Sequence, residues 1–445
     1  SQWVDYRDRT YQEELQLKGT YDRFSFTTGV YLFHEWWYTN RRANTGANFT
    51  RVNGNGTTTS ISNSNVASEV RYNPIYTEIR QKTDNIAWYG EGKYSATDAL
   101  TLTAGLRINY ERHSNNNQLY SLSTTPVDAT NFYQILFSAP KALIWSVNPH
   151  QSWTTWQPRV SLDYKFTPDV TAYGTVARGT KSAGYEFRAQ TASNAGRLQA
   201  ELPFNPEVVT SYEIGVKTKW LNGRVIANLT GFYLNFDDIQ ITTTDSQNAG
   251  ISRRFNAGKG SSRGVEFEAQ LAPSPGLVFD VNGAYLDARL DEYIGAVNVP
   301  TVIPANVYYP NGASINNQPF VGARLANSPK WQGRAAVTWE LPLAVPGAIA
   351  INADVNYQSS SYTNGNNAIT SRLPEQTLIN ARLSYTTEDG HWTAALSARN
   401  LLDKQYAMGA GYTIDGNSGA ARLPAWRSAN LTDPRTILFT ITFRR

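Results

Sequence analysis

The 445-residue sequence contains no cysteine, one methionine and four histidines. The absence of cysteine excludes a disulfide framework, a cysteine-ligated zinc site and a thiol nucleophile. The histidines do not have metal-ligand spacing, and no G-x-S-x-G, H-E-x-x-H or P-loop motif occurs. We therefore predict no catalytic residues, no metal site and no cofactor, and we expect that the protein is not an enzyme.

Long hydrophobic runs and blocks of like charge are also missing. No segment approaches the roughly 18 consecutive apolar residues that a membrane-spanning helix needs. The 40 basic and 36 acidic residues are spread along the chain and leave a net charge of +4, so we expect no nucleic-acid partner. The chain begins Ser1-Gln2-Trp3, which is neither a translation start nor a signal peptide. We expect that part of the natural N-terminal region is not in this chain.

Aromatic residues, in contrast, are abundant, with 12 tryptophans, 26 tyrosines and 17 phenylalanines. Such amphipathic rings favour membrane–water interfaces. The chain also alternates between apolar and polar residues, most clearly from Leu100 to Glu111. Because successive side chains of a strand point to opposite faces, this alternation predicts strands with one lipid-compatible face and one wet face.

The alternating pattern recurs in fifteen segments, centred near residues 16, 30, 88, 105, 160, 174, 213, 230, 265, 282, 334, 353, 381, 397 and 439. The connections between them alternate strictly between tight turns and long polar segments, of which the first two are expected to run roughly from Thr39 to Ile79 and from His113 to Ser152. In outer-membrane barrels the short turns are periplasmic and the long loops are extracellular. We therefore predict an all-β fold, a transmembrane antiparallel β-barrel over residues 1–445, in the outer membrane of a Gram-negative bacterium.

A soluble β-sandwich, β-helix or propeller is the alternative fold. Soluble antiparallel sheets also alternate, since one of their faces packs on a core. However, strands in soluble domains are usually about five or six residues long. Such folds also do not sort their connections into two size classes, so we favour the membrane barrel.

Four segments resemble the TonB-dependent outer-membrane receptor family. Residues Asn205–Lys217 read NPEVVTSYEIGVK and are similar to the family's "NPE…YE.G.K" phrase. Asn256-Ala257-Gly258 with Ser262–Glu266 resembles its "NAG…RGVE" strand. The other two matches are Ala398–Tyr406, similar to "NL.D..Y", and Pro434-Arg435-Thr436, similar to the closing "PR" segment. The four matches are spread across about half of the chain, and in this order and spacing they are specific to the family.

The resemblance implies a barrel of about 22 strands, preceded by a globular plug and a short segment that contacts TonB. Fifteen is an odd number, whereas bacterial single-chain barrels have even strand counts. We therefore expect that the N-terminal plug domain and the first strands of the barrel are not in this chain. Phe443 is followed by Arg444 and Arg445, a departure from the aromatic end that the barrel assembly machinery reads in this family.

Several polar residues of these segments have a structural interpretation. Five charged residues are assigned to the wet face, where ion pairs satisfy them: Glu213, Lys217, Arg263, Glu266 and Glu268. The segments Asn256–Gly258 and Asn400–Asp403 are expected to shape strand ends and the barrel rim. We interpret these residues as structural rather than ligand-binding.

Ligand contacts are expected at the extracellular rim. His34-Glu35-Trp36-Trp37-Tyr38 is either an aromatic girdle with the base of a loop, or a platform for a flat or aromatic ligand that faces the lumen. Basic residues near the sixth and ninth strands suit an anionic ligand, but equally suit lipopolysaccharide phosphates or loop carboxylates. The candidate ligand-binding residues are His34, Trp36, Trp37, Arg178, Lys181, Tyr185, Arg253 and Arg254.

The resemblance implies TonB-dependent active import of a bulky nutrient, with a ferric siderophore as the commonest class of ligand. The iron–siderophore complex would then be cargo and not a cofactor. Two alternatives remain: a passive porin of about 16–18 strands with a water-filled lumen, or a structural outer-membrane barrel that anchors a surface partner. The expected partners are outer-membrane lipid and lipopolysaccharide, the TonB energy-coupling system, the barrel assembly machinery, and a surface lipoprotein or other receptor subunit.

Overall fold

The structure is a computed structural model of the chain. It describes residues 2–44, 49–52, 58–61, 74–122, 140–186, 197, 200–244, 252–293, 321–363, 367, 371–414 and 424–444. Most of these residues lie in strands, and a short 3-10 helix, Leu221–Gly223, forms one of the turns. Within these ranges, no helix has the length and apolar character needed to cross a membrane.

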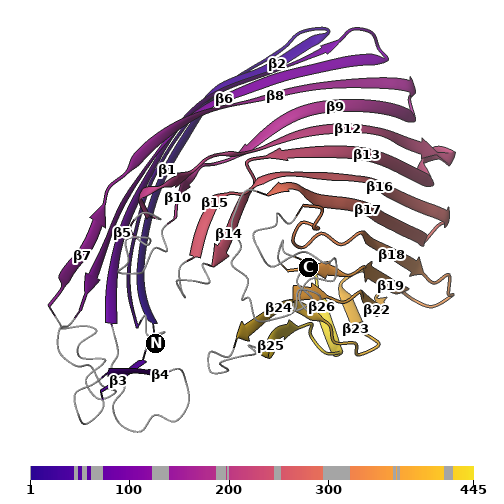
Figure 1. The fold of residues 1–445 in the computed structure, drawn as a ribbon. Coiled ribbons are helices and arrows are strands. Elements are labelled where there is room, and N and C mark those ends of the chain that lie inside the picture. Colours follow the sequence, from indigo (N-terminus) through magenta and orange to yellow (C-terminus); the bar gives the residue numbers. More distant parts are fainter. Residues whose placement is uncertain are drawn as a thin grey trace.

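The main element is one antiparallel sheet in which fifteen strands follow one another in chain order (Figure 1). A further strand, β7 (Ala142–Val147), pairs with β6. The two outermost strands, β1 and β26, each pair with a single neighbour among the described residues. The fifteen strands are β1 (Gln2–Thr20), β2 (Phe24–Asn44), β5 (Pro74–Ser95), β6 (Leu100–Ser121), β8 (His150–Thr167), β9 (Val170–Lys181), β12 (Glu207–Trp220), β13 (Val225–Asp237), β16 (Gly258–Ser274), β17 (Leu277–Tyr293), β18 (Trp331–Glu340), β19 (Ala348–Gln358), β22 (Gln376–Thr386), β23 (Trp392–Arg399) and β26 (Thr436–Phe443).

Each strand predicted from the alternating pattern is present, and the predicted tight turns join neighbouring strands. Several turns use a backbone conformation that favours glycine or asparagine. Asn222 has a φ of 56°, and Gly276, Gly347 and Gly390 have φ values of 78°, 91° and 72°. The prediction of antiparallel strands joined by alternating short and long connections is therefore confirmed.

Strand length differs strongly between the two halves of the sheet. β2, β5 and β6 have 21, 22 and 22 residues, whereas β23 and β26 have 8 each. About 9–11 residues suffice for a tilted strand to cross a membrane. The long strands therefore continue for about ten residues, or roughly 33 Å, beyond the membrane. Because their tight turns lie at the periplasmic end, this extension forms a tall extracellular wall.

The predicted long loops contain more structure than expected. The loops were expected to begin at Thr39 and His113, but β2 ends at Asn44 and β6 ends at Ser121. Beyond the membrane both faces of a strand meet water, so the polar sequence there loses the alternation that reveals a strand. The connections also contain small hairpins: β3 (Phe49–Val52) with β4 (Thr58–Ile61), β10 (Gly184–Tyr185) with β11 (Pro203–Phe204), β14 (Gln240–Thr244) with β15 (Ser252–Asn256), β20 (Ser361–Tyr362) with β21 (Arg372–Leu373), and β24 (Ala407–Ile414) with β25 (Pro424–Leu431).

The curved sheet has an inner and an outer face. The inner face is the concave one, on the side where the β14–β15 hairpin lies (Figure 1). The outer face carries long apolar side chains in register, such as the row Leu15, Val30, Trp88 and Ile108, each at least 39% exposed. Exposed apolar rows of this kind fit contact with lipid, and the inner face then lines the lumen.

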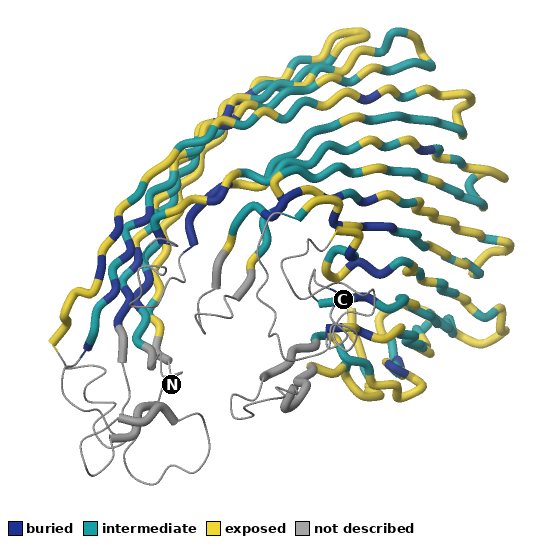
Figure 2. Tube along the Cα trace, viewed as in Figure 1, coloured by how far each residue is buried: buried dark blue, intermediate teal, exposed yellow. Residues whose placement is uncertain are grey.

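Burial is concentrated toward the long connections and not at the tight turns (Figure 2). Leu119, Trp145, Val147 and Ala200 form a small apolar cluster in which no residue is more than 7% exposed. The side-chain amide of Asn115 donates a hydrogen bond to the Ala200 carbonyl oxygen at 2.9 Å. The connection between β9 and β12 thus packs onto the inner face of β6.

Candidate functional site

The extracellular ends of β8, β12 and β16 meet at Asn205 on the inner side of the rim. The indole Nε1 of Trp153 donates to Asn205 Oδ1 at 3.3 Å. The backbone amide of Asn205 donates to Asn256 Oδ1 at 2.7 Å, and Asn256 Nδ2 donates to the carbonyl oxygens of Asn205 and Asp238 at 3.0 and 2.9 Å. The two asparagines that open the "NPE" and "NAG" phrases are therefore direct partners, which confirms that the Asn256 segment shapes the rim.

Gln240 ties the same region to β9. Its side-chain amide donates to the carbonyl oxygens of Ser182 and Asn205 at 2.9 and 3.0 Å. Its backbone amide donates to Glu207 Oε2 at 2.7 Å, and Lys181 Nζ lies 3.8 Å from the same oxygen. The connections after β9 and β13, which are distant in sequence, are thus joined by hydrogen bonds, so the inner rim here is an ordered surface.

A carboxylate and three rings complete this surface. Glu111 Oε1 accepts hydrogen bonds from Asn85 Nδ2 and Ser182 Oγ, both at 2.9 Å. The His113 and Trp153 rings are 5.7 Å apart, and the Trp153 and Tyr185 rings are 6.5 Å apart. Tyr185 is 6% exposed, and burial raises the pKa of its hydroxyl, so the ring stays neutral at physiological pH. The surface offers neutral aromatic and hydrogen-bonding groups together with the cationic Lys181.

The predicted ligand-binding residues do not form one site, because they lie on both faces of the sheet. Trp36 and Trp37 are consecutive in β2, so they point to opposite sides. Trp37 lies on the inner face, where its ring is 5.9 Å from that of Tyr6. His34 has the orientation of the exposed Leu32, and its Nδ1 lies 2.6 Å from Asp84 Oδ1 on the outer face.

The basic candidates are divided in the same way. The Arg178 guanidinium lies over the Trp156 ring at 4.5 Å, and both residues share the outer face with Val176 and Val160. Arg254 belongs to the rim, where its guanidinium lies 5.5 Å from the Phe204 ring and its Nε donates to Thr242 Oγ1 at 3.2 Å. The Arg253 backbone pairs with Thr243 in the β14–β15 hairpin, and its side chain is outside the described part of the chain. Of the eight candidates, Trp37, Lys181, Tyr185 and Arg254 therefore remain on the inner side.

Sequence reasoning missed Trp153, Glu111 and Gln240. No local pattern distinguishes them, because their importance comes from partners in other connections. The phrase containing Asn205 was recognised, but its hydrogen bonds to Asn256 and Trp153 depend on the arrangement of β8, β12 and β16.

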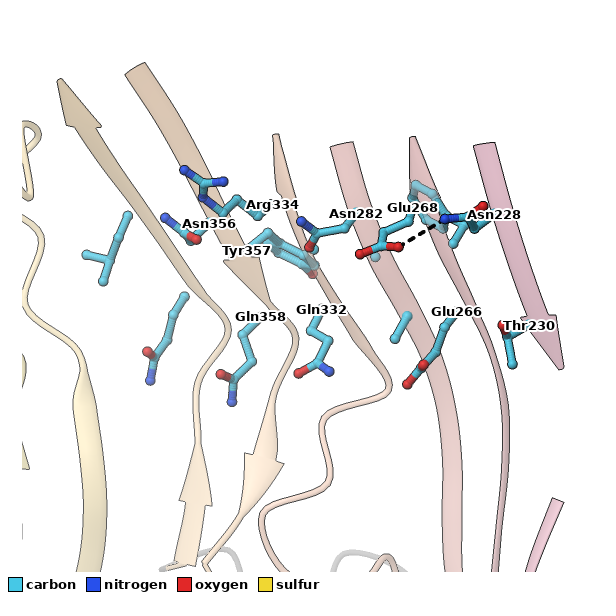
Figure 3. Close-up of a pocket in the computed structure, with 16 residues that line it drawn as sticks. Asn228, Thr230, Glu266, Glu268, Asn282, Gln332, Arg334, Asn356, Tyr357 and Gln358 are labelled. Atoms are coloured by element: carbon cyan, nitrogen blue, oxygen red, sulfur yellow. Dashed lines mark hydrogen bonds between the residues drawn. The ribbon is translucent and has the colours of Figure 1, made fainter. Parts of the chain in front are cut away.

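Below the rim, the inner face forms a polar wall with a recess of about 660 Å³ (Figure 3). Two register rows cross the strands from β13 to β22 here. One contains Thr230, Glu266, Gln332, Gln358 and Gln376, and the other contains Asn228, Glu268, Asn282, Arg334 and Asn356.

Two charged residues of this wall, Glu268 and Arg334, have partners nearby. Asn228 Nδ2 donates to Glu268 Oε2 at 3.3 Å, and Arg334 lies 3.5 Å from Asp354. Such an amide-rich surface can hydrogen-bond water or a polar protein segment. Within the described ranges, no group of three histidine or carboxylate side chains is arranged to hold a metal ion.

One wet-face assignment was wrong. Glu266 and Glu268 do line the inner recess, and Glu213 and Lys217 share that side of β12. Arg263, however, has the orientation of Val265 and Phe267 and lies on the outer face. The prediction placed Arg263 on the wet face because its side chain is charged. Arg263 is the first residue of the outer face on the extracellular side of the apolar part of β16.

The "NL.D..Y" segment also has a structural role, as predicted. Asn400 has a φ of 49°, and its Nδ2 donates to the carbonyl oxygens of Lys404 and Asp433 at 2.8 and 2.9 Å. The Asp403 carboxylate accepts a hydrogen bond from the Arg435 amide at 2.9 Å. These contacts hold the start of β26 against the end of β23.

A family model described as "TonB dependent receptor-like, beta-barrel" matches residues 1–401. The pesticin receptor of Yersinia enterocolitica is 23% identical over 348 residues, which are 78% of this chain and 43% of that protein. The metal-pseudopaline receptor CntO of Pseudomonas aeruginosa is 27% identical over 253 residues, which are 56% of this chain and 30% of that protein. The chain thus spans less than half the length of these relatives.

Two solved structures share the fold. The ferric yersiniabactin uptake receptor FyuA from Yersinia pestis has a TM-score of 0.69 and 18% identity, covering 100% of this chain and 55% of that one. The siderophore receptor PiuA from Acinetobacter baumannii has a TM-score of 0.63 and 15% identity, covering 99% and 56%. At these identities the likeness shows the fold alone.

Proposed function

The chain belongs to the TonB-dependent receptor-like β-barrel family of outer-membrane proteins, and on this basis we propose that the complete protein actively imports a bulky metal chelate such as a ferric siderophore. Members of this family are transporters and not enzymes. The names of the relatives support this class of ligand, since they are receptors for ferric yersiniabactin, for metal–pseudopaline and for other siderophores.

The tall extracellular wall is the observation that carries the proposal. A passive pore needs strands that only cross the membrane, whereas β2, β5 and β6 are about twice that length. On the inner side, Glu111 of β6 accepts a hydrogen bond from Ser182 in the connection after β9, and Asn205 and Gln240 join this connection to β8 and to the connection after β13. An ordered inner surface held above the membrane suits capture of a large ligand from outside.

We propose that the ligand contacts the inner rim near Trp153, Lys181 and Tyr185, with Trp37 and Arg254 as further contacts. The cationic Lys181 and Arg254 suit a chelate with a negative charge, and the rings suit flat aromatic groups on it. His34, Trp36 and Arg178 are not included, because they face the surrounding membrane or its headgroups.

We also propose that a plug domain fills the lumen of the complete protein. The fifteen strands form one arc, and among the described residues its end strands β1 and β26 are each paired along one edge only. A barrel large enough to continue this arc, of about 22 strands, is blocked by a plug in transporters of this kind. TonB would act on that plug, whereas the described wall would stay rigid.

Ligand uptake should therefore require energy. In cells that carry the complete gene, deletion of TonB or collapse of the proton gradient should abolish accumulation of a radiolabelled ferric siderophore while binding at the cell surface persists. Gradient-independent entry of small solutes through the intact protein would instead identify a porin. Neither binding nor uptake by the complete protein would favour a structural barrel that anchors a surface partner.

A second experiment tests the rim. Lys181→Gln should weaken surface binding of an anionic chelate, because it removes an exposed inner cation of the rim. His34→Gln is the matched control, since it changes a polar ring on the outer face of the same wall. Equal binding by both variants would contradict the proposed contact surface.

Two further partners are proposed. The barrel assembly machinery would recognise β26, where Phe443 packs against Trp392 with ring centroids 4.8 Å apart. A surface lipoprotein or other receptor subunit would dock on the extracellular connections.

A further inference from the structure

Two arginines on the outer face share one buried carboxylate. Arg263 in β16 is the register partner of Asp287 in β17, and Arg289 lies two residues farther along β17. Arg263 Nη2 is 3.3 Å from Asp287 Oδ2, and Arg289 Nε is 2.7 Å from Asp287 Oδ1. The Asp287 side chain is 8% exposed, whereas those of Arg263 and Arg289 are 70% and 46% exposed. The group thus carries a net positive charge that faces outward.

The group lies at the boundary of the apolar surface. On β16 the outer side chains nearer the tight turn are Val265, Phe267 and Leu271, each at least 43% exposed. Residues 265–273 span roughly 30 Å along the strand at about 3.4 Å each. A tilt of about 40° reduces this length to roughly 23 Å, close to the apolar band of about 25 Å in outer-membrane barrels. Arg263 therefore lies at the level of the lipid headgroups.

Aromatic residues mark the same level. The rings of Tyr285 and Trp331, which are register partners on the outer face, are 4.7 Å apart. Tyr233 is the register partner of Arg263 and is 42% exposed. Tyrosine and tryptophan collect at membrane–water interfaces because their rings have an apolar body and a polar edge.

The excess of cations distinguishes this group from the outer ion pairs of Arg7 and Arg80. Arg7 and Arg80 each pair with a carboxylate of their own, Asp5 and Glu78, so those pairs are neutral. In the described ranges, Asp287 is the only carboxylate within ion-pair distance of Arg263 or Arg289. A guanidinium has five N–H donors, and Asp287 engages few of those on the two side chains. The remaining donors suit a phosphate, which guanidinium groups bind with paired hydrogen bonds.

We propose that Arg263 and Arg289 bind the phosphate of a phosphorylated glycolipid in the outer leaflet of the surrounding membrane. Asp287 holds the two guanidinium groups side by side and prevents them from separating by repulsion. The phosphate neutralises the remaining charge, while the acyl chains of the same lipid cover Val265 and Phe267. A membrane lipid fits better than a soluble anion, because the group faces sideways from the barrel, directly beside the apolar band. This inference depends on membrane insertion and is independent of the transported ligand.

The test measures how much lipid the complete protein retains in mild detergent. Bisphosphorylated lipid A is added as the probe to the delipidated protein, and the lipid A that stays bound is quantified by native mass spectrometry. Arg263→Gln should reduce retention by roughly tenfold or more, since one charged donor group to the phosphate is lost. Arg263 is 70% exposed, so its replacement should leave folding intact, as verified by the heat-dependent shift of the barrel on gels.

Two controls separate the site from general charge effects. Arg334→Gln removes an arginine that lies on the inner wall beside Asp354, and it should retain lipid A at the level of the unsubstituted protein. Dephosphorylated lipid A should bind to the unsubstituted protein as weakly as lipid A binds to the Arg263→Gln protein. Inorganic phosphate at equal concentration should not displace bound lipid A. Equal retention of phosphorylated and dephosphorylated lipid, an equal loss in both variants, or displacement by inorganic phosphate would each overturn the proposal.

Discussion

A charge placed at the centre of the outer face should destabilise the barrel, and Ile214→Arg is the sharpest test. Ile214 lies in the middle of β12 and is 70% exposed on the outer face. Its register partners on both sides are glycines, Gly174 in β9 and Gly231 in β13. No directly opposite side chain can therefore shield an arginine at this position from the surrounding lipid.

The expected loss of stability follows from the position of Ile214 in the middle of the strand, near the membrane midplane. An arginine on the lipid face costs about 2–4 kcal/mol at the membrane midplane and about 0–1 kcal/mol near the interfaces. Ile214 is seven residues from Glu207 and six from Trp220, the two ends of the strand, so the midplane values apply. The folding equilibrium should fall by roughly 30-fold to 1000-fold, because each 1.4 kcal/mol is a factor of about ten.

The assay is reversible urea unfolding of the complete protein in lipid vesicles, followed by tryptophan fluorescence. Asn282→Arg is the matched control, because Asn282 lies on the polar inner wall between Glu268 and Arg334 (Figure 3). Its replacement should change the free energy of unfolding by about 0.5 kcal/mol or less. If both variants lost the same stability, the assignment of the two faces would be wrong.

Three other predictions concern the topology, the rim and a periplasmic turn. On intact cells, a membrane-impermeant thiol reagent should label Leu202→Cys, which is in an exposed part of a long connection, and should spare Asn222→Cys in a tight turn. The reverse labelling pattern would show that the topology is inverted. Gly258→Ala should lower stability by about 1–3 kcal/mol in thermal unfolding, because the φ of Gly258 is 125° and an added Cβ would overlap the Glu292 carbonyl group. The control Gly409→Ala should have little effect, since an added Cβ there would meet open space. Hydrogen bonds from the Thr387 hydroxyl and the His391 amide lower the pKa of Asp389 below its ordinary value of 3.8. The stabilisation of the fold by the Asp389 carboxylate is therefore present above pH 3.8 and is lost as the pH falls through the lowered pKa. The stability difference between the unsubstituted protein and Asp389→Asn should therefore vanish in strong acid, and a difference that persisted there would contradict the role of the carboxylate.

Much of the fold could be predicted locally. The alternation of apolar and polar residues has a period of two, the period of a strand, so each of the fifteen strands is visible in its own segment. Asn222, Gly276 and Gly390 similarly mark turns, because few other residues adopt a positive φ at low cost. The strands that continue beyond the membrane were underestimated, since water on both faces removes the apolar half of the pattern.

The same limit explains why the candidate ligand-binding residues lie on both faces and why Arg263 was assigned to the wrong face. At the membrane boundary a charged residue is tolerated on either face, so polarity did not reveal that His34, Arg178 and Arg263 point outward. Their side followed only from register with apolar neighbours such as Leu32, Val176 and Val265.

The amino-acid sequence determined the fifteen main strands and the alternation of short and long connections, because strand formation and turn geometry depend on neighbouring residues. The tertiary structure decided which polar residues meet. Asn205, Asn256 and Gln240 come together with Trp153 and Ser182 only because the sheet curves and brings the connections of β9 and β13 over the same rim. The Arg263–Asp287–Arg289 group likewise needs the register between β16 and β17, which the pairing of whole strands sets.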